Sequence, residues 1–114
     1  GFWASPRTHA ATEINLLLGA INMLLAQPPR ESDRDHPIRL VLANVTEPIH
    51  REFTARFGVD IVSTWALAEG PLGTMTAPGH GYRAGENGWP MGEQNEVRVV
   101  DEDDNPLPDG EVGE

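Results

Sequence analysis

The 114-residue sequence contains no cysteine. This absence excludes a disulfide framework, a thiolate metal site and a cysteine nucleophile. Lysine is absent as well, so the eight Lys and Arg residues counted together are all arginine. No lysine-dependent step can be carried out by these residues. A phosphate-binding loop of the G-x-x-x-x-G-K-[ST] type is excluded for the same reason.

Aromatic residues make up only 6% of the sequence, and no apolar run approaches the roughly 20 residues of a membrane-crossing helix. The hydrophobic fraction of 39% is ordinary for one folded soluble domain. The N-terminal residues lack the pattern of a signal peptide, and we expect a cytoplasmic protein. The formal charge of −10 argues against nucleic acid as a partner, because phosphate backbones bind basic patches.

Two common kinds of catalytic site find no support in the pattern of histidines and serines. The histidines lack the short spacings of zinc ligands, and the serines lack a G-x-S-x-G context. The residues concerned are His9, His36, His50, His80, Ser5, Ser32 and Ser63. A zinc centre and a serine hydrolase site are therefore not predicted.

The spacing of apolar residues predicts an α/β fold whose first part is a three-stranded parallel βαβαβ unit. Strands are expected at 10–17, 38–42 and 59–65, and helices at 19–27 and 47–57. The middle strand is almost continuously apolar, as expected for a strand covered on both faces. Short connections imply right-handed crossovers and parallel strands. The segment from Arg30 to Pro37, between the first helix and the middle strand, reads as a charged loop.

The helix at 47–57 has the clearest signals. Thr46 is placed as its N-cap, Pro48 falls in its first turn, and Gly58 supplies a left-handed stop. An apolar stripe recurs at helical spacing through Ile49, Phe53 and Phe57. Acid–base pairs four residues apart are expected to add weak support, about 0.3 kcal/mol each. These pairs are Glu47–Arg51 and Glu52–Arg56.

The C-terminal part of the sequence predicts a long loop and an incomplete hairpin. Glycines and prolines recur between Pro71 and Pro90, and an alternating strand pattern follows at 96–101. A turn at 103–106 would lead to a returning arm near 110–114. We therefore divide the sequence into a βαβαβ segment at 1–82 and a loop with the first arm of a truncated hairpin at 83–114.

Two strand ends are candidates for a binding site, because ligands of open parallel sheets bind beyond the carboxyl ends of the strands. Small residues follow the second strand at 43–45 and the third strand at 66–68. Trp65 offers a surface for stacking, and Glu69 is a lone carboxylate of the kind that holds Mg²⁺ beside phosphates. From the residues alone, Trp65 could equally be a core aromatic at a strand end, and a solvated loop acid is the simpler interpretation of Glu69.

An ordered series of short motifs covers nearly the whole sequence. It comprises Arg56-Phe57-Gly58-Val59, Trp65-Ala66-Leu67-Ala68-Glu69, Gly88-Trp89-Pro90, Val97-Arg98-Val99-Val100-Asp101-Glu102-Asp103, and the run from Pro106 to Glu114. This succession resembles the middle of an adenylate-forming enzyme, one of the AMP-binding acyl-CoA synthetases and ligases. Gln27-Pro28-Pro29 with Asp33-Arg34 is most similar to the crotonobetaine/carnitine-CoA ligase branch.

The resemblance implies roles for the loop after the third strand. The family's core motif there reads tyrosine, glycine, methionine, threonine and glutamate. Trp65 takes the tyrosine position near adenine, and Ala66 and Leu67 replace glycine and methionine. Ala68 replaces the threonine whose hydroxyl contacts phosphate, a loss that could cost ~1–3 kcal/mol. Glu69 keeps the glutamate that binds Mg²⁺.

The resemblance also assigns the neighbouring loops. The Gly-Gly-Ala loop that flanks adenine falls at Ala43, Asn44 and Val45, and Gly70 borders the acyl pocket. The phosphate-gripping loop lies upstream in the family. The ribose-binding aspartate, the hinge and the catalytic lysine lie downstream. We therefore expect an internal piece of the large N-terminal domain, with no complete catalytic set and no activity by itself.

For the parent protein, the resemblance implies an ATP-dependent acid–thiol ligase. Such an enzyme converts a carboxylic acid into an acyl-adenylate and transfers the acyl group to CoA, using ATP and Mg²⁺ and forming AMP. The expected partners are the acid, CoA and the remainder of the parent enzyme. The main alternative is a non-catalytic nucleotide-binding or scaffold relative, which Ala68 favours and Glu69 opposes. An unrelated α/β domain is a third alternative.

Overall fold

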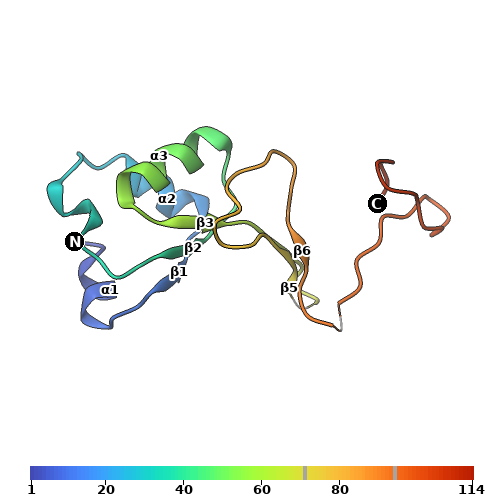
Figure 1. The fold of residues 1–114 in the computed structure, drawn as a ribbon, viewed down its shortest axis with the longest axis horizontal. Helices are drawn as coiled ribbons and strands as arrows, with labels where there is room; N and C mark the ends of the chain where they lie inside the picture. The colour runs from blue at the N-terminus through green and yellow to red at the C-terminus, as the bar shows by residue number, and fades with distance from the viewer. Residues whose placement is uncertain (71, 94) are drawn as a thin grey trace.

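The computed structural model describes residues 1–70, 72–93 and 95–114. Helices and strands concentrate in the first two thirds of the chain (Figure 1). In order they are α1 (Ala4–Thr8), β1 (Glu13–Asn15), α2 (Leu18–Leu25), the short 3₁₀ helix η1 (Glu31–Arg34), β2 (Leu40–Leu42), α3 (Glu47–Phe57), β3 (Asp60–Val62), β4 (Thr64–Ala66), β5 (Leu72–Met75) and β6 (Trp89–Pro90).

The first sheet is parallel, with the order β1-β2-β3. Its register aligns Ile14, Val41 and Ile61 in one row across the three strands. Helix α2 connects β1 to β2 and α3 connects β2 to β3. Two crossovers of the same hand between successive neighbours place both helices on one face of the sheet, as Figure 1 shows. The predicted three-stranded parallel βαβαβ unit is confirmed.

Helix α3 forms as its sequence predicts. Thr46 has an extended backbone at the N-cap position, although its side chain makes no capping hydrogen bond. Phe53 and Phe57 are buried at the centre of the core, with 0% and 2% of their surface exposed. Gly58 ends the helix in the left-handed conformation, with φ of 68°. Helix α2 contributes Ile21 to the same core.

The strands of this sheet are shorter than the sequence predicts. The apolar run at 38–42 gives a strand only at Leu40–Leu42, and the first strand is limited to Glu13–Asn15. Full cover on both faces of the middle strand is also wrong, because Leu40 and Leu42 are only half-buried. Their strand neighbours Glu13 and Asn15 are exposed on the same face, so the described chain leaves that face partly open to solvent.

The third predicted strand, 59–65, is interrupted at Ser63. Its first part is β3 of the parallel sheet, and its second part is β4 of a separate antiparallel sheet with the order β4-β5-β6. The sequence predicts one strand and a long loop in this region, and both predictions are wrong. The predicted loop after Gly70 contains β5 and β6.

Two glycines explain why the antiparallel sheet can form from a segment rich in glycine and proline. A Cβ atom at Gly73 would collide with the indole of Trp65, and a Cβ atom at Gly88 would overlap the carbonyl group of Met75. Gly88 also has a positive φ of 81°. Because these glycines have no side chain, the neighbouring strands can approach closely. The sequence alone suggested that the glycines only interrupt regular structure.

The predicted strand at 96–101 does not form. Val100 makes an isolated antiparallel bridge with Pro106, and the side chains of Val97 and Val99 are 44% and 45% exposed. The alternating pattern has no packed face in the described chain, so it does not yield a regular strand. The returning segment does approach, because the backbone N–H and C=O of Val100 both pair with Glu114, at 3.1 and 2.9 Å.

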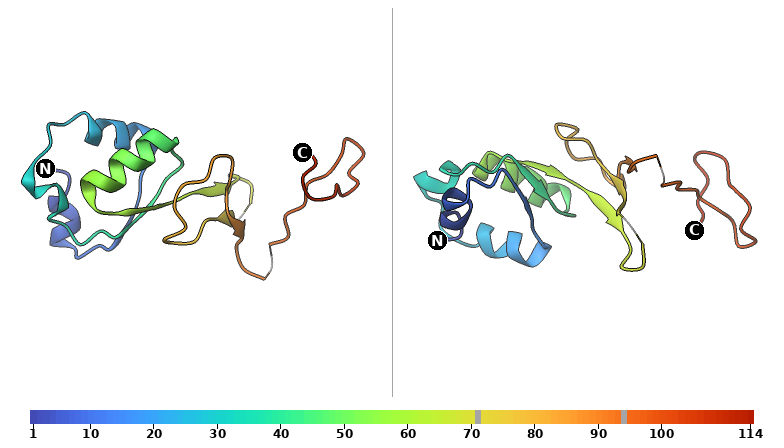
Figure 2. Two further views of the ribbon diagram at one scale, coloured as in Figure 1. Left: turned by 45° about the horizontal axis from the view of Figure 1, so that its top comes forward. Right: turned by 90° about the horizontal axis from the view of Figure 1, so that it is seen from below.

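The molecule is elongated, with extents of 54 × 27 × 23 Å. The α/β unit lies at one end, the antiparallel sheet in the middle, and the C-terminal residues extend away from both (Figure 2). The radius of gyration is 16.8 Å, against about 13 Å for a compact chain of this size. Within the described residues, no helix is both long enough and apolar enough to cross a bilayer.

Candidate functional site

The carboxyl edge of the parallel sheet brings the two predicted loops together. After β2 ends, the N–H of Ala43 donates to the carbonyl of Val62 at 3.0 Å. The side-chain amide of Asn44 donates to the carbonyl of Thr64 at 2.7 Å, and its oxygen accepts the N–H of Thr64 at 3.0 Å. The loop at 43–45 is thereby joined to the residue that precedes Trp65.

The exit of the chain from the parallel sheet is held by a second side chain. Thr76, which is 5% exposed, accepts the N–H of Ser63 on Oγ1 at 2.9 Å. The N–H of Thr76 donates to the carbonyl of Ser63 at 3.0 Å. Ser63 and Thr64 are therefore fixed from two sides at the point where the chain passes from one sheet to the other. This role of Thr76 is not predictable from the sequence, since nothing in the local pattern signals the contact.

Trp65 is not a core residue, because 44% of its surface is exposed. Its ring lies against the backbone of Gly73 on the neighbouring strand, where a larger residue would collide with it. The core interpretation of Trp65 is therefore wrong. The remaining exposed ring surface fits the predicted stacking role, which stays a prediction.

The residues from Leu67 to Gly70 form an exposed turn after β4. The N–H of Gly70 donates to the carbonyl of Leu67 at 3.3 Å, and Leu67 is 55% exposed. Ala68 and Glu69 lie at the tip of this turn and are exposed. No described residue forms a hydrogen bond or ion pair with the Glu69 carboxylate, so it is free to coordinate a cation.

Mg²⁺ is compatible with this arrangement. It usually binds proteins through one or two carboxylates, with water and substrate phosphates completing the octahedron. A single free carboxylate at an exposed turn fits that donor set. Over the part of the chain that the structure describes, no group of three or more potential ligands forms a self-contained metal site. Glu69 therefore suits a shared site with phosphate, and not a protein-only cage.

The loop between β5 and β6 holds a further polar cluster. His80 Nε2 and Glu86 Oε1 are 2.9 Å apart, and the ring of His80 contacts the ring of Trp89 edge-on at 5.0 Å. The N–H of Gly79 donates to the side chain of Asp60, which ties this loop to β3. These contacts order the loop beside the strand that leads to the site.

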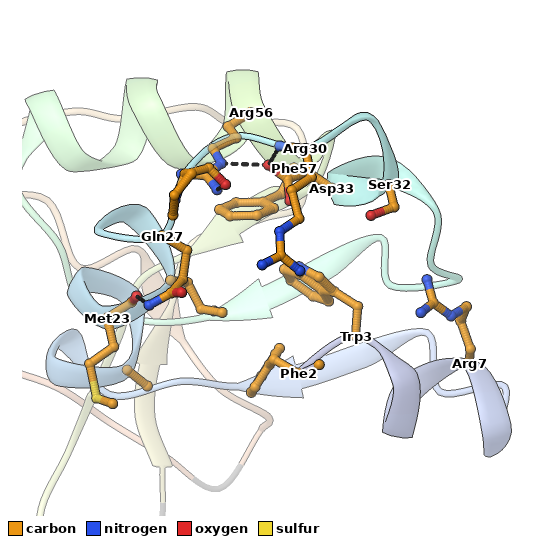
Figure 3. A pocket seen from close by; sticks show the side chains of 14 residues that line it. Phe2, Trp3, Arg7, Met23, Gln27, Arg30, Ser32, Asp33, Arg56 and Phe57 are labelled. Carbon is orange, nitrogen blue, oxygen red and sulfur yellow. Dashed lines mark hydrogen bonds and ion pairs between the residues drawn. The ribbon is translucent and has the colours of Figure 1, made fainter.

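A cavity of about 450 Å³ lies at the opposite edge of the parallel sheet, near the ends of α2 and α3 (Figure 3). Its walls include Phe2, Trp3, Met23, Gln27, Asp33 and Arg56. None of the residues predicted to bind nucleotide or metal lines it. The amino edge of a parallel sheet is also not where such folds bind ligands, so the cavity is not the candidate site.

Arg56 and Asp33 form an ion pair beside this cavity, with Nε and Oδ2 2.7 Å apart and both side chains 12% exposed. Arg56 also donates to the carbonyls of Leu25 and Pro28, at 3.0 and 3.2 Å. The expected helix pair of Arg56 with Glu52 is therefore replaced by a contact with η1. Asp33 is buried, whereas Glu52 is exposed, and the Asp33 carboxylate also accepts the N–H of Arg30 at 3.0 Å.

The electrostatic balance at Asp33 favours its charged form. Burial by itself raises the pKa of the carboxyl group, but the hydrogen bonds from Arg56 and from the Arg30 N–H outweigh burial. The net effect is a pKa below the ordinary value of 3.8. This ion pair therefore stabilises the packing of η1 on the end of α3.

Comparison with known proteins places the fold and the site in context. The family model of the AMP-binding enzymes matches residues 2–114. The chain belongs to this family. The chain is 32% identical to the crotonobetaine/carnitine–CoA ligases of Salmonella heidelberg and Shigella sonnei, over 99% of its own length. It spans 22% of the length of these curated relatives.

Solved structures agree with this assignment. A benzoate CoA ligase from Burkholderia xenovorans superposes on this chain with a TM-score of 0.79 and 25% identity, covering 98% of this chain and 23% of that one. An anthranilate CoA ligase, solved with anthranoyl-AMP, superposes with a TM-score of 0.76. At 21% identity, over 98% of this chain and 22% of that one, the second likeness shows the fold alone.

Proposed function

We propose that this chain is a segment of an ATP-dependent carboxylate–CoA ligase. In the first half-reaction, a carboxylate oxygen attacks the α-phosphorus of ATP, and pyrophosphate leaves. In the second, the thiol of CoA attacks the acyl carbon of the adenylate, and AMP leaves. The relatives named above, which are CoA ligases, support this reaction class.

One observation carries the proposal. The loop at 43–45 and the loop at 65–69 meet at the carboxyl edge of the parallel sheet, through the paired hydrogen bonds of Asn44 with Thr64. This edge is where a flat ligand can reach backbone groups from both loops at once. A half-exposed tryptophan and a free carboxylate stand on the second loop, as an adenine and a phosphate-bound cation require.

Within this proposal, the chain's own residues bind and orient the substrate. Ala43, Asn44 and Val45 form one wall of the adenine site, and Trp65 with Ala66 and Leu67 forms the other. Ala68 offers phosphate no hydroxyl, and Gly70 borders the acyl pocket. Glu69 would hold Mg²⁺, which when bound neutralises charge on the phosphate oxygens. Catalysis of the first half-reaction then depends on positioning and charge neutralisation.

A non-catalytic relative that binds nucleotide without turnover is the second candidate. Ala68 favours it, because a main hydrogen-bond donor to phosphate is replaced by a methyl group. The free carboxylate of Glu69 and the half-exposed ring of Trp65 favour the ligase. The two candidates differ in one measurable property, which is adenylate formation.

ATP–pyrophosphate exchange in the full-length protein separates them. We expect exchange that depends on the added acid when a panel of carboxylic acids is tested, including trimethylammonio acids and aromatic acids. The isolated chain, residues 1–114, is expected to show no exchange under the same conditions. Nucleotide binding without exchange for any acid would establish the non-catalytic candidate.

A further inference from the structure

We propose that Asn44 is a positioning residue that sets the distance between the two walls of the adenine site. Its side-chain amide links the wall at 43–45 to Thr64, the residue immediately before Trp65. The inference rests on the proposed function, because it names the part of the chain that shapes the nucleotide slot.

The amide of Asn44 uses both of its ends. Its nitrogen donates to the carbonyl of Thr64 at 2.7 Å, and its oxygen accepts the N–H of the same residue at 3.0 Å. Only one orientation of the amide satisfies both bonds, because the nitrogen cannot accept and the oxygen cannot donate. The two bonds reach the peptide groups on either side of Thr64, so they fix the orientation of the backbone at this residue as well as its distance from Asn44.

The position of Thr64 explains why this contact is needed. The parallel pairing of β2 with β3 ends with Leu42 opposite Val62, and one further backbone bond follows from Ala43 to Val62. Beyond that point, the backbone of β2 turns away toward α3. The side chain of Asn44 takes over the role of a strand backbone and extends the pairing to Thr64.

Ser63 and Thr64 form the junction at which the chain passes from the parallel sheet to the antiparallel sheet. Thr76 holds the other side of this junction independently of Asn44. Thr76 bonds both backbone groups of Ser63, using its hydroxyl and its N–H. With Ser63 and Thr64 both fixed, the chain enters β4 in a defined direction, and Trp65 is carried into place against Gly73. Loss of the Asn44 bonds frees one side of the junction and leaves the antiparallel sheet intact.

The sequence resemblance gives the contact a further meaning. Asn44 stands where the family's loop has a glycine, which has no side chain to form such a bridge. Here the loop has gained an amide while the core motif has lost its glycine and its threonine. The bridge therefore provides a local way to hold the altered motif in position.

Steady-state kinetics in the full-length protein test this role. We compare Asn44→Asp and Asn44→Ala with Thr74→Val as a control. Thr74 is 8% exposed on β5, and its hydroxyl has no partner among the described residues, so its removal should leave the KM for ATP unchanged and should not lower the thermal midpoint. Asn44→Asp places a carboxylate oxygen against the Thr64 carbonyl, so its effect should exceed that of Asn44→Ala.

We expect Asn44→Asp to raise the KM for ATP about tenfold in the exchange assay, and Asn44→Ala to raise it about threefold, each with an unchanged KM for CoA in the complete reaction. Thermal unfolding should show both variants folded.

An unchanged KM for ATP in folded variants would overturn the inference and leave the proposed function standing. A parallel loss for ATP and CoA would also overturn it, since that indicates general disruption. Absence of exchange in the unsubstituted protein would overturn the proposed function and the inference with it.

Discussion

The regions before and after Ser63 are ordered by different physical means. In the part of the chain that the structure describes, the buried hydrophobic residues all lie between Trp3 and Val62. Beyond Ser63, the buried polar residues are Thr74 and Thr76, while Trp65 and Trp89 are about half-exposed. Burial of apolar surface holds the first region, and backbone pairing with close contacts at glycine holds the second.

This difference explains where the candidate site lies. Its first wall follows directly from a buried strand, since Val41 is 0% and Ala43 5% exposed. Its second wall stands on β4 and the exposed turn at 67–70, which have little core beneath them. The bonds from Asn44 and Thr76 join the two at the boundary. We therefore expect substitutions of buried apolar residues to cost the most stability before Ser63. After Ser63, we expect the largest losses where a side chain is added at a glycine that allows close approach.

The largest effect is expected from Phe53→Ala, which empties a fully buried position between the parallel sheet and α2. It should lower the free energy of unfolding by about 3–5 kcal/mol. Val99→Ala in the C-terminal region should change it by less than about 0.5 kcal/mol, because that side chain is 45% exposed. Denaturant unfolding of the full-length protein measures both. Equal losses would contradict the division into two regions.

A smaller and pH-dependent effect is expected from Asp33→Asn, which removes the negative charge facing Arg56. The loss should be about 1.5–3 kcal/mol near neutral pH, the range for a hydrogen bond between charged groups. Because the pKa of Asp33 is lowered on folding, its contribution is fully present above 3.8 and is lost as the pH falls through the lower folded value.

The difference in stability between Asp33→Asn and the unsubstituted protein should therefore shrink below pH 3.8 and remain constant above about pH 5. Asp35→Asn is a matched control, since Asp35 pairs with Arg7 but its side chain is 75% exposed. That control should change stability by less than about 1 kcal/mol. A difference for Asp33→Asn that grows on acidification would contradict the assigned role of the charge.

A further loss of stability is expected from Gly88→Ala, since the positive φ alone costs a residue with a side chain about 1–3 kcal/mol and the Cβ atom would also overlap the backbone of Met75. Gly85→Ala is the matched control. Gly85 also has a positive φ, 76° against 81° at Gly88, but a Cβ atom there would meet no other atom within 4 Å. The excess loss in Gly88→Ala isolates the close approach of β6 to β5. Matched losses in the two variants would show that backbone strain alone is at work.

The sequence predicted the first region well and the second poorly, for a physical reason. The stripe of Phe53 and Phe57 and the stop at Gly58 are local signals, and the helix follows them closely. The roles of Gly73 and Gly88 depend on which distant atoms approach them, which local pattern does not reveal. Val97 and Val99 alternate like strand residues, but a strand also needs a partner and a face to bury.

The candidate site shows the same division. The meeting of the two loops at one edge could be predicted, because parallel topology places both carboxyl ends of the strands there. The bridge from Asn44 to Thr64 could not, because an asparagine in a loop has many available partners. The exposure of Trp65 also depended on the sheet switch at Ser63, which a continuous β-rich run conceals.

We propose that Glu69 supplies the carboxylate for a cation shared with ATP phosphates. Acid-dependent ATP–pyrophosphate exchange in the full-length protein, titrated with Mg²⁺, tests it most directly. We expect Glu69→Gln to lower kcat/KM about a hundredfold and to raise the Mg²⁺ requirement. Glu93→Gln, at another exposed turn, should leave both unchanged. Equal activity and equal Mg²⁺ dependence in Glu69→Gln and the unsubstituted protein would contradict the account.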